Sequence, residues 1–312
     1  MDTFSHLTLS FTTIDPIEAL LACAAAIAIG AWLARKQAQA FKGAPHNQEQ
    51  VTSHDALGFP PVTVAEYGDM RFLHLGTPAV QGSMKISQPF EIHLDYVQRM
   101  MGWLLFADLD RVNHMHAMQL GLGAAALTKF CHRQLRMQTT AIELNPQVIA
   151  TCRRCFELPA DDARLRVVLS DAARAVKSDI WRANVDVLQV DLYDQDAARP
   201  VLDSEDFYRD CRNLLTQEGC LIVNLFGHNA NKAMSLKNLS AAFGQDALWT
   251  FKPTPSGNTI VLGFHTPREL SHAALLRQAQ MIETRWSLPA TKWLKVLNKV
   301  SIEAKGQTQL QR

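Results

Sequence analysis

The chain has almost no excess of charge of either sign. Its 31 lysine and arginine residues balance 30 aspartate and glutamate residues, which leaves a formal net charge of +1. A surface that binds nucleic acid carries a strong basic excess, so we expect no nucleic-acid partner. The hydrophobic fraction of 47% is ordinary for a globular protein, and 312 residues suffice for one large domain with additions.

Cysteine is scarce, with six residues spread over the expected helices and strands. This spread differs from the turn-rich spacing of a disulfide framework. Cys152 and Cys155 form a C-x-x-C pair, but the pair lies inside an expected helix rather than at a helix start, and no second pair completes a zinc site. We therefore expect buried or half-buried thiols, no metal, and a reducing, cytoplasmic location.

The sequence also has no run of about 20 apolar residues, the length that spans a bilayer. Residues 19–34 come closest, as an uncharged Ala-rich run between Glu18 and Arg35-Lys36. The acidic flank precedes the basic one, opposite to the order in a signal peptide. Two alternatives stay open: a membrane anchor that keeps the rest of the chain on the cytosolic side, or an Ala-rich helix outside the membrane.

No phosphate cradle accompanies the one nucleotide-binding pattern in the chain. Residues 118–143 read as an apolar strand, a Gly121-Leu122-Gly123 turn, a helix, and a second strand that ends at Glu143. The first glycine permits a sharp turn, the second lets a ligand approach the backbone, and the acid can accept hydrogen bonds from ribose hydroxyls. Three alanines follow Gly123, so a nucleoside without pyrophosphate, such as S-adenosylmethionine or a derivative, fits better than NAD.

Alternating strand and helix patterns follow along the chain. We expect strands at 115–120, 137–143, 165–169, 185–191, 218–225, 246–252 and 258–264. We expect helices around 124–135, 146–156, 172–180, 204–215 and 231–244. Strands separated by helices predict a doubly wound, mostly parallel α/β sheet. The loop at 253–258 joins the last two strands, so the seventh should run antiparallel. In pattern this resembles the class I methyltransferase fold.

The flanking segments suggest four regions. Residues 1–60 read as an apolar helix followed by a polar linker, and residues 61–90 as a small β hairpin or meander. Residues 91–265 form the nucleoside-binding domain. Residues 266–312 read as a helical tail, whose apolar residues alternate with lysines, that docks on the domain or on a partner.

Acidic residues follow three consecutive strands, at the edge where open α/β sheets bind ligands. They are Glu143, Asp171 (followed by Ala172) and Asp191. Each alone could be a helix N-cap, and for a single acid we weigh capping and binding about equally. Together they favour a site in which Glu143 holds ribose, Asp171 accepts from the adenine amino group, and Asp191 faces the reacting centre.

The stretch from about Gly82 to Gly263 resembles the spermidine synthase (polyamine aminopropyltransferase) family. The resemblance rests on motifs in the family's order: Gln81-Gly82-Ser83-Met84, Leu94-Asp95-Tyr96, the G-x-G turn, A-I-E-L-N-P, S-D-A, D-L-Y-D, and D-F-Y-R-x-C-R-x-L-L-x-x-x-G. It covers more than half of the chain.

This resemblance implies transfer of an aminopropyl group from decarboxylated S-adenosylmethionine to an amine such as putrescine. Asp191 would take a proton from the attacking amine, and Asp194 would hold that amine. Tyr96 would line the substrate channel, and Gln81 would contact substrate. The sulfonium is an activated leaving group, so no metal is needed, and family members are commonly dimeric or tetrameric.

Two family features are changed in this chain. The family's Gly-Gly-Gly-Asp-Gly-Gly loop reads Gly-Leu-Gly-Ala-Ala-Ala, so Ala124 replaces an acid that contacts the amine parts of both substrates. The family's Asp-Pro after the fourth strand is replaced by Gln195-Asp196. Loss of the acid favours a carboxylated donor. An aminopropyltransferase, a methyltransferase on the same fold and a binding protein without catalysis therefore all stay open.

Overall fold

The computed structural model describes residues 58–193, 201–226 and 229–300. The possible anchor at 19–34 and the predicted amine ligand Asp194 lie outside these residues. Among the helices of the described ranges, none combines the length and the apolar character needed to cross a membrane.

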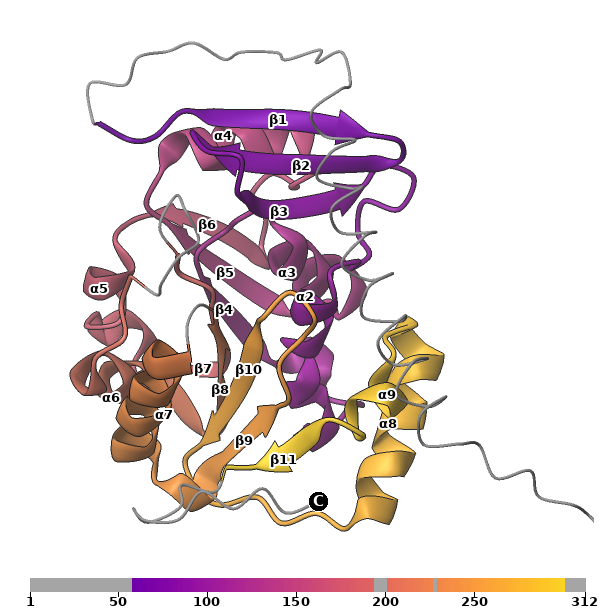
Figure 1. The fold of residues 1–312 in the computed structure, drawn as a ribbon, viewed down its shortest axis with the longest axis vertical. Helices are drawn as coiled ribbons and strands as arrows, with labels where there is room; N and C mark the ends of the chain where they lie inside the picture. Colours follow the sequence, from indigo (N-terminus) through magenta and orange to yellow (C-terminus); the bar gives the residue numbers. More distant parts are fainter. Residues whose placement is uncertain (1–57, 194–200, 227–228, 301–312) are drawn as a thin grey trace, which may run out of the picture. The chain divides into compact units, whose positions relative to one another are not determined.

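A small antiparallel meander begins the described chain and is drawn at the top of Figure 1. It consists of β1 (Val62–Tyr67), β2 (Met70–Leu75) and β3 (Val80–Lys85). Its inner face buries Val62, Leu73 and Met84 against residues of the following domain, because alternate side chains of a strand point to the same face. The hairpin or meander predicted within residues 61–90 is confirmed.

The main sheet contains eight strands. Their bounds are β4 (His116–Leu120), β5 (Gln138–Glu143), β6 (Leu165–Leu169), β7 (Val185–Val190), β8 (Leu215–Leu225), β9 (Leu248–Phe251), β10 (Thr259–Phe264) and β11 (Leu297–Lys299). The spatial order is β11-β9-β10-β8-β7-β4-β5-β6. Strands β4 to β8 are parallel, whereas β10 runs antiparallel to both β8 and β9. The predicted doubly wound sheet with a reversed seventh strand is confirmed.

The eighth strand lies in the tail that the sequence pattern assigned to a helix. After α8 (His272–Trp286) and the short α9 (Ala290–Trp293), the chain becomes extended and pairs with the outer edge of β9. Lys252 N–H donates to Val296 O at 2.8 Å, and Val300 N–H donates to Leu248 O at 3.0 Å. The helical expectation is therefore wrong for residues 297–299. The N–H and C=O groups on the open edge of β9 form hydrogen bonds with this segment, and these replace the hydrogen bonds of another helical turn.

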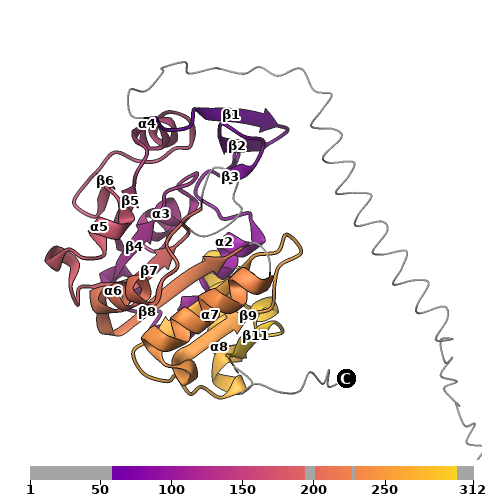
Figure 2. The ribbon, with the colours of Figure 1, turned by 60° about the vertical axis from the view of Figure 1, so that its left-hand side comes forward.

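Helices cover both faces of the sheet (Figures 1 and 2). One face packs against α2 (Asp95–Arg99), a 3₁₀ turn (Gly102–Phe106), α3 (Ala126–Lys129), α8 and α9. The other packs against α5 (Ala172–Ala175), α6 (Glu205–Leu214) and α7 (Asn229–Phe243). Neighbouring residues of β7 alternate between the two cores, with Val187 in the first and Leu188 in the second.

Helix α4 (Pro146–Cys155) packs beneath the meander and carries the C-x-x-C pair. Cys152 is fully buried and Cys155 is half-buried. Burial raises the pKa of the Cys152 thiol, so this residue is an unreactive core side chain, as expected.

The turn between β4 and α3 requires three residues with positive φ. Gly121 has φ +89° and Gly123 has φ +50°, which glycine adopts freely. Ala125, which immediately precedes α3, has φ +59°. A left-handed conformation costs an alanine about 1–2 kcal/mol because its Cβ approaches the following carbonyl oxygen. The turn is therefore held under strain at Ala125.

Ala125→Gly should leave the free energy of unfolding within about 0.5 kcal/mol of wild type, measured by urea denaturation. The relieved strain of about 1–2 kcal/mol offsets the roughly 0.4–1 kcal/mol that glycine adds to the entropy of the unfolded chain and the about 0.8 kcal/mol lost with the buried methyl group. Ala126→Gly is the matched control: Ala126 lies within α3, and this change should destabilise by about 0.5–1 kcal/mol. Equal destabilisation by both changes would contradict the strain at Ala125.

Candidate functional site

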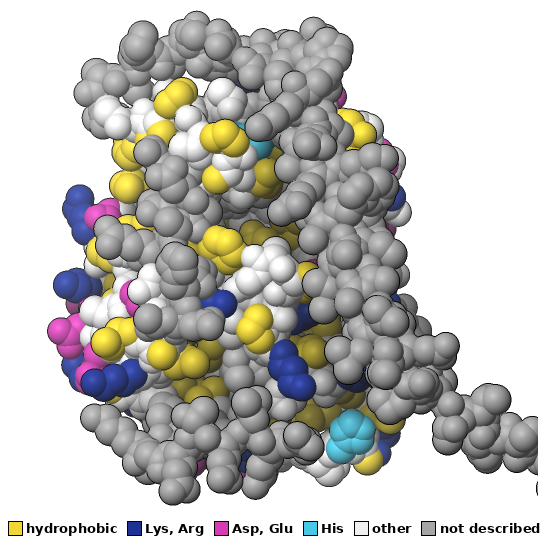
Figure 3. All heavy atoms as spheres, in the orientation of Figure 1, with side chains coloured by type: hydrophobic (Ala, Val, Ile, Leu, Met, Phe, Trp, Pro, Cys, Tyr) yellow, Lys and Arg dark blue, Asp and Glu magenta, His cyan; other side chains and the backbone are white. Residues whose placement is uncertain are grey.

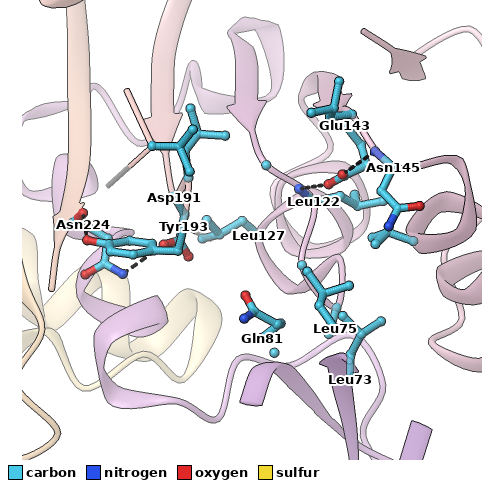
Figure 4. A pocket seen from close by; sticks show the side chains of 18 of the residues that line it. Leu73, Leu75, Gln81, Leu122, Leu127, Glu143, Asn145, Asp191, Tyr193 and Asn224 are labelled. Atoms are coloured by element: carbon cyan, nitrogen blue, oxygen red, sulfur yellow. Dashed lines mark hydrogen bonds between the residues drawn. The ribbon is translucent and has the colours of Figure 1, made fainter. Parts of the chain in front are cut away.

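A cavity of about 660 Å³ lies between the meander and the carboxyl ends of β4 to β7. In Figure 3, hydrophobic side chains gather in the middle of the face shown, between these two parts. Figure 4 shows Glu143 and Asn145 on one side of the cavity, Asp191 and Asn224 on the other, and Gln81 between them. The order of the strands reverses between β4 and β7, which is where open α/β sheets bind ligands.

Gly121 brings the ends of β4 and β7 into close contact. A Cβ atom at this position would overlap the carbonyl oxygen of Asp191. The amide of Asp191 in turn donates to Leu120 O at 3.1 Å. Glycine at 121 therefore permits the approach that places Asp191 beside the turn.

A second close contact seats the meander on the same turn. A Cβ atom on Gly82 of β3 would lie 2.6 Å from Ala124 N and 2.7 Å from Ala124 Cβ. A Cβ atom on Gly123 would lie 3.0 Å from Gln81 O. The residues of the Gln81-Gly82 motif thus lie directly on the turn, and Gln81 lines the cavity.

Glu143, at the end of β5, is held by two backbone amides. Its carboxylate accepts from Leu122 N–H at 3.0 Å and from Asn145 N–H at 2.8 Å. Burial raises the pKa of the Glu143 carboxyl, although these amides act in the opposite direction. The side chain is fixed beside the turn, and carboxylate oxygens have further lone pairs for a ligand's hydroxyl groups.

Asp171 is the N-cap of α5. One carboxylate oxygen accepts from Ala173 N–H at 2.7 Å, and the residue is exposed. It also lines the cavity, together with Ala172. The capping and binding interpretations are compatible, since the second carboxylate oxygen remains available.

Asp191 follows β7 and is surrounded by protein except on the cavity side. Its Oδ1 accepts from Asn224 Nδ2 at 2.8 Å, and the hydroxyl of Tyr96 donates to the same carboxyl. Burial raises the pKa of Asp191 from its ordinary 3.8 to about 6, while the two donors act to lower it. A carboxyl with this pKa is ionised at neutral pH and can accept a proton there.

Tyr193 lies beside Asp191 but uses its hydroxyl within the fold. The hydroxyl donates to Asn224 O at 2.7 Å and accepts from Phe226 N–H at 2.5 Å. Its ring packs edge-on against Phe226, with centroids 6.2 Å apart. Tyr193 and Phe226 therefore form an aromatic wall of the cavity near Asp191.

The site residues predicted from sequence within the described ranges all line this one cavity. They are Gln81, Tyr96, Gly121, Gly123, Glu143, Asp171, Ala172 and Asp191. Sequence reasoning missed Asn224 and Asn258, which also line it. Asn224 lies inside β8, one residue before its end, so reading the residues that follow each strand does not find it.

The described lining residues carry three carboxylates, Glu143, Asp171 and Asp191, and include no lysine, arginine or histidine. Lys129 does not reach the cavity; it is buried and donates to Phe156 O at 2.6 Å. Within the described ranges, no three His, Cys, Asp or Glu side chains come together as a metal site would require. The described wall is therefore acidic and apolar.

Comparisons with known proteins show what this chain is similar to. The chain is 34% identical to the polyamine aminopropyltransferase of Neisseria meningitidis serogroup A over 233 residues, covering 74% of this chain and 86% of that protein. Among solved structures, a probable spermidine synthase from Corynebacterium glutamicum matches with a TM-score of 0.59 and 16% identity, covering 82% and 96% of the two chains. Human methyltransferase-like protein 13, in complex with SAH, matches with a TM-score of 0.56 and 22% identity, covering 62% and 93%. No family model matches the chain.

The raised pKa of Asp191 predicts how Asp191→Asn changes stability. The folded state binds the proton more tightly than the unfolded state, so this carboxyl costs stability as pH rises from about 4 to about 6. The variant lacks that loss. The free energy of unfolding of the variant minus that of wild type should therefore be larger at pH 7 than at pH 4, by roughly 2 kcal/mol. Urea denaturation at pH 4, 5, 6 and 7 measures this, and a difference that is constant with pH would contradict it.

Proposed function

The chain belongs to the polyamine aminopropyltransferase family, and from this premise we propose that it transfers an aminopropyl group from decarboxylated S-adenosylmethionine to an amine. The observation that carries the proposal is an acidic cavity with Asp191 at the point where the strand order of the sheet reverses. A dication as donor and an ammonium as acceptor both complement such a wall.

The adenosine part of the donor is proposed to bind along the ends of β4, β5 and β6. Glu143 would accept from the ribose hydroxyls, and its fixed position between two backbone amides supports this role. Asp171 and Ala172 would contact adenine, and Gly121 and Gly123 would allow the nucleoside to approach the backbone.

We propose the decarboxylated form of the donor because of the charge of the cavity wall. S-adenosylmethionine carries a carboxylate, which among the described lining residues would meet carboxylates and no cationic side chain. Decarboxylated S-adenosylmethionine lacks that group and keeps its ammonium and sulfonium charges. We weigh this above the replacement of the family acid by Ala124, since one lost carboxylate leaves the wall acidic.

The proposed reaction requires removal of one proton. An amine with a pKa near 10 is an ammonium at neutral pH and has no free lone pair. Asp191 accepts that proton, and the nitrogen attacks the carbon next to the sulfonium. The C–N bond forms, the C–S bond breaks with its electron pair going to sulfur, and neutral methylthioadenosine leaves. The cationic sulfur makes this departure favourable without a metal.

The acceptor is proposed to lie between Asp191 and the aromatic rings around it. Tyr96 hydrogen-bonds Asp191, and an aromatic ring can flank a cationic chain. Gln81 contacts substrate in this arrangement, and Asp194 would hold the amine. We also propose a homodimer, the simplest assembly of the family.

Calorimetric titration with methylthioadenosine, decarboxylated S-adenosylmethionine and S-adenosylmethionine, each with and without putrescine, tests the proposal. We expect the decarboxylated donor to bind at least about tenfold more tightly than the carboxylated one, or about 1.4 kcal/mol. We also expect methylthioadenosine release when donor and amine are combined. Methyl transfer from S-adenosylmethionine would instead establish a methyltransferase, and failure of all three ligands to bind would remove the proposed site.

Asp191→Asn should lower kcat/KM by about 10²–10⁴-fold, because the base is lost. Its affinity for methylthioadenosine should stay within about threefold of wild type, since Asp191 is not proposed to contact adenosine. The wild-type kcat/KM should fall on the acidic side of about pH 6, where Asp191 becomes protonated.

Asp186→Asn provides the matched control for that variant. Asp186 lies on the same strand at the other end, where it accepts from His116 N–H and the Thr216 hydroxyl. This change should cost stability and leave kcat within about threefold. A comparable loss of activity in both variants would show that the effect of Asp191→Asn is structural.

A further inference from the structure

A chain of hydrogen bonds connects Asp191 to the loop between β9 and β10. Asn224 Nδ2 donates to Asp191 Oδ1 at 2.8 Å, and Asn258 Nδ2 donates to Asn224 Oδ1 at 3.1 Å. Ser256 Oγ donates to Asn258 Oδ1 at 3.0 Å. Figure 4 shows the Asn224 amide directed at Asp191. Four side chains thus form a continuous path that ends on the carboxyl group.

The donors along this path all point the same way. Each amide accepts at its oxygen on the loop side and donates from its nitrogen on the Asp191 side. Thr254 extends the path, because its Oγ1 lies 2.9 Å from Ser256 Oγ and accepts from Asn258 N–H at 3.1 Å. Aligned hydrogen bonds polarise one another in a low-dielectric interior. The alignment therefore strengthens the last donor, the one that contacts Asp191.

The two amides of the path are buried, whereas Ser256 at its start is exposed, and the loop that carries Ser256 is held in place. Asn224 is 4% exposed and Asn258 is 8% exposed. Within the loop, Thr254 N–H donates to Asn258 O at 2.8 Å and Gly257 N–H donates to Thr254 O at 2.9 Å. Lys232 Nζ caps the loop by donating to Gly257 O at 2.8 Å. Burial and these bonds keep the Asn258 amide facing Asn224.

We propose that Asn224 and Asn258 are positioning residues for Asp191: Asn258 orients the Asn224 amide, and Asn224 directs its N–H at the carboxylate and favours its ionised form. The inference rests on the proposed role of Asp191 as the group that accepts the amine's proton. With Oδ1 engaged by Asn224, Oδ2 has lone pairs for the substrate.

The described groups around Asp191 are neutral, so stabilisation of its ionised form falls to hydrogen-bond donors such as the Asn224 amide. The titratable groups facing it from neighbouring elements are Tyr96 of α2 and Tyr193 after β7. Burial raises the pKa of both phenols, so both are neutral at physiological pH. Among the described lining residues no cation balances the carboxylate, so neutral donors supply its stabilisation.

The test measures the pKa of Asp191 by ¹³C NMR of the full-length protein labelled at aspartate carboxyl carbons, with Asp191→Asn used to assign the signal. Asn224→Leu removes the donor and should raise that pKa by about one pH unit. Asn258→Leu leaves the donor present but unoriented, and should raise it by a smaller amount. The acidic limb of kcat/KM should move to higher pH in the same order.

Asn258→Asp gives a second variant. A carboxylate at 258 accepts but cannot donate, so the Asn224 amide should turn over and present its oxygen to Asp191. The pKa of Asp191 should then rise more than in Asn258→Leu, and since the added negative charge contributes to that rise, the neutral Asn258→Leu variant decides whether the amide is oriented. Should Asn224→Leu fail to fold, the two Asn258 variants still test the proposal.

Gln119→Leu is the matched control. It breaks another buried amide pair of the same sheet, Gln119 Nε2 to Gln189 Oε1 at 2.9 Å, and neither glutamine lines the cavity. Stability should fall while the pKa of Asp191 stays unchanged. Asn258 variants that behave like this control would overturn the proposal.

The NMR measurement requires no turnover, which separates this inference from the proposed function. A shifted Asp191 pKa in the Asn258 variants of a protein that transfers no aminopropyl group would support the orienting path and reject the reaction. An active enzyme in which the pKa does not respond would support the reaction and reject the orienting path.

Discussion

The contact between the ends of β4 and β7 is the constraint on which the rest of the site depends. At Gly121 the two backbones approach so closely that a single Cβ atom would overlap the carbonyl oxygen of Asp191. This approach places the Gly121-Leu122-Gly123 turn beside the Asp191 carboxyl. The same turn carries Ala124, on which Gly82 of the meander is seated. Two glycines far apart in the sequence thus determine how three parts of the fold meet around one cavity.

Much of the fold could be predicted because its signals are local. Alternation of strands and helices, and a loop rather than a helix before the last strand, sufficed for the parallel sheet and its reversed strand. Reading the residues after the first four strands located Glu143, Asp171 and Asp191, since carboxyl ends of parallel strands meet at one edge. All three line the cavity. The roles assigned to them stay predictions.

What escaped prediction depends on contacts between distant segments. Strand β11 forms because β9 has an open edge, whereas its own sequence has helical spacing. The Asn258–Asn224 bond joins residues 34 positions apart and leaves no periodic signal. The strain at Ala125 also leaves no signal in the sequence. Alanine normally favours a helix, and the turn alone imposes the left-handed backbone of Ala125.

The reversed direction of β10 has a consequence for how such an enzyme can diversify. Parallel strands deliver only their last residues to the ligand edge, and the ends of β4, β5 and β6 are the ones proposed to bind the nucleoside. Strand β10 runs the opposite way, so its first residues arrive at the same edge, carried by a hairpin loop outside the nucleoside-binding segments. Under the proposal that Asn258 orients Asn224, substitutions in this loop would change the acidity of Asp191, a residue that they do not contact. Under the same proposal, the acidity of Asp191 could be matched to amines of different basicity without changes at Glu143 or Asp171.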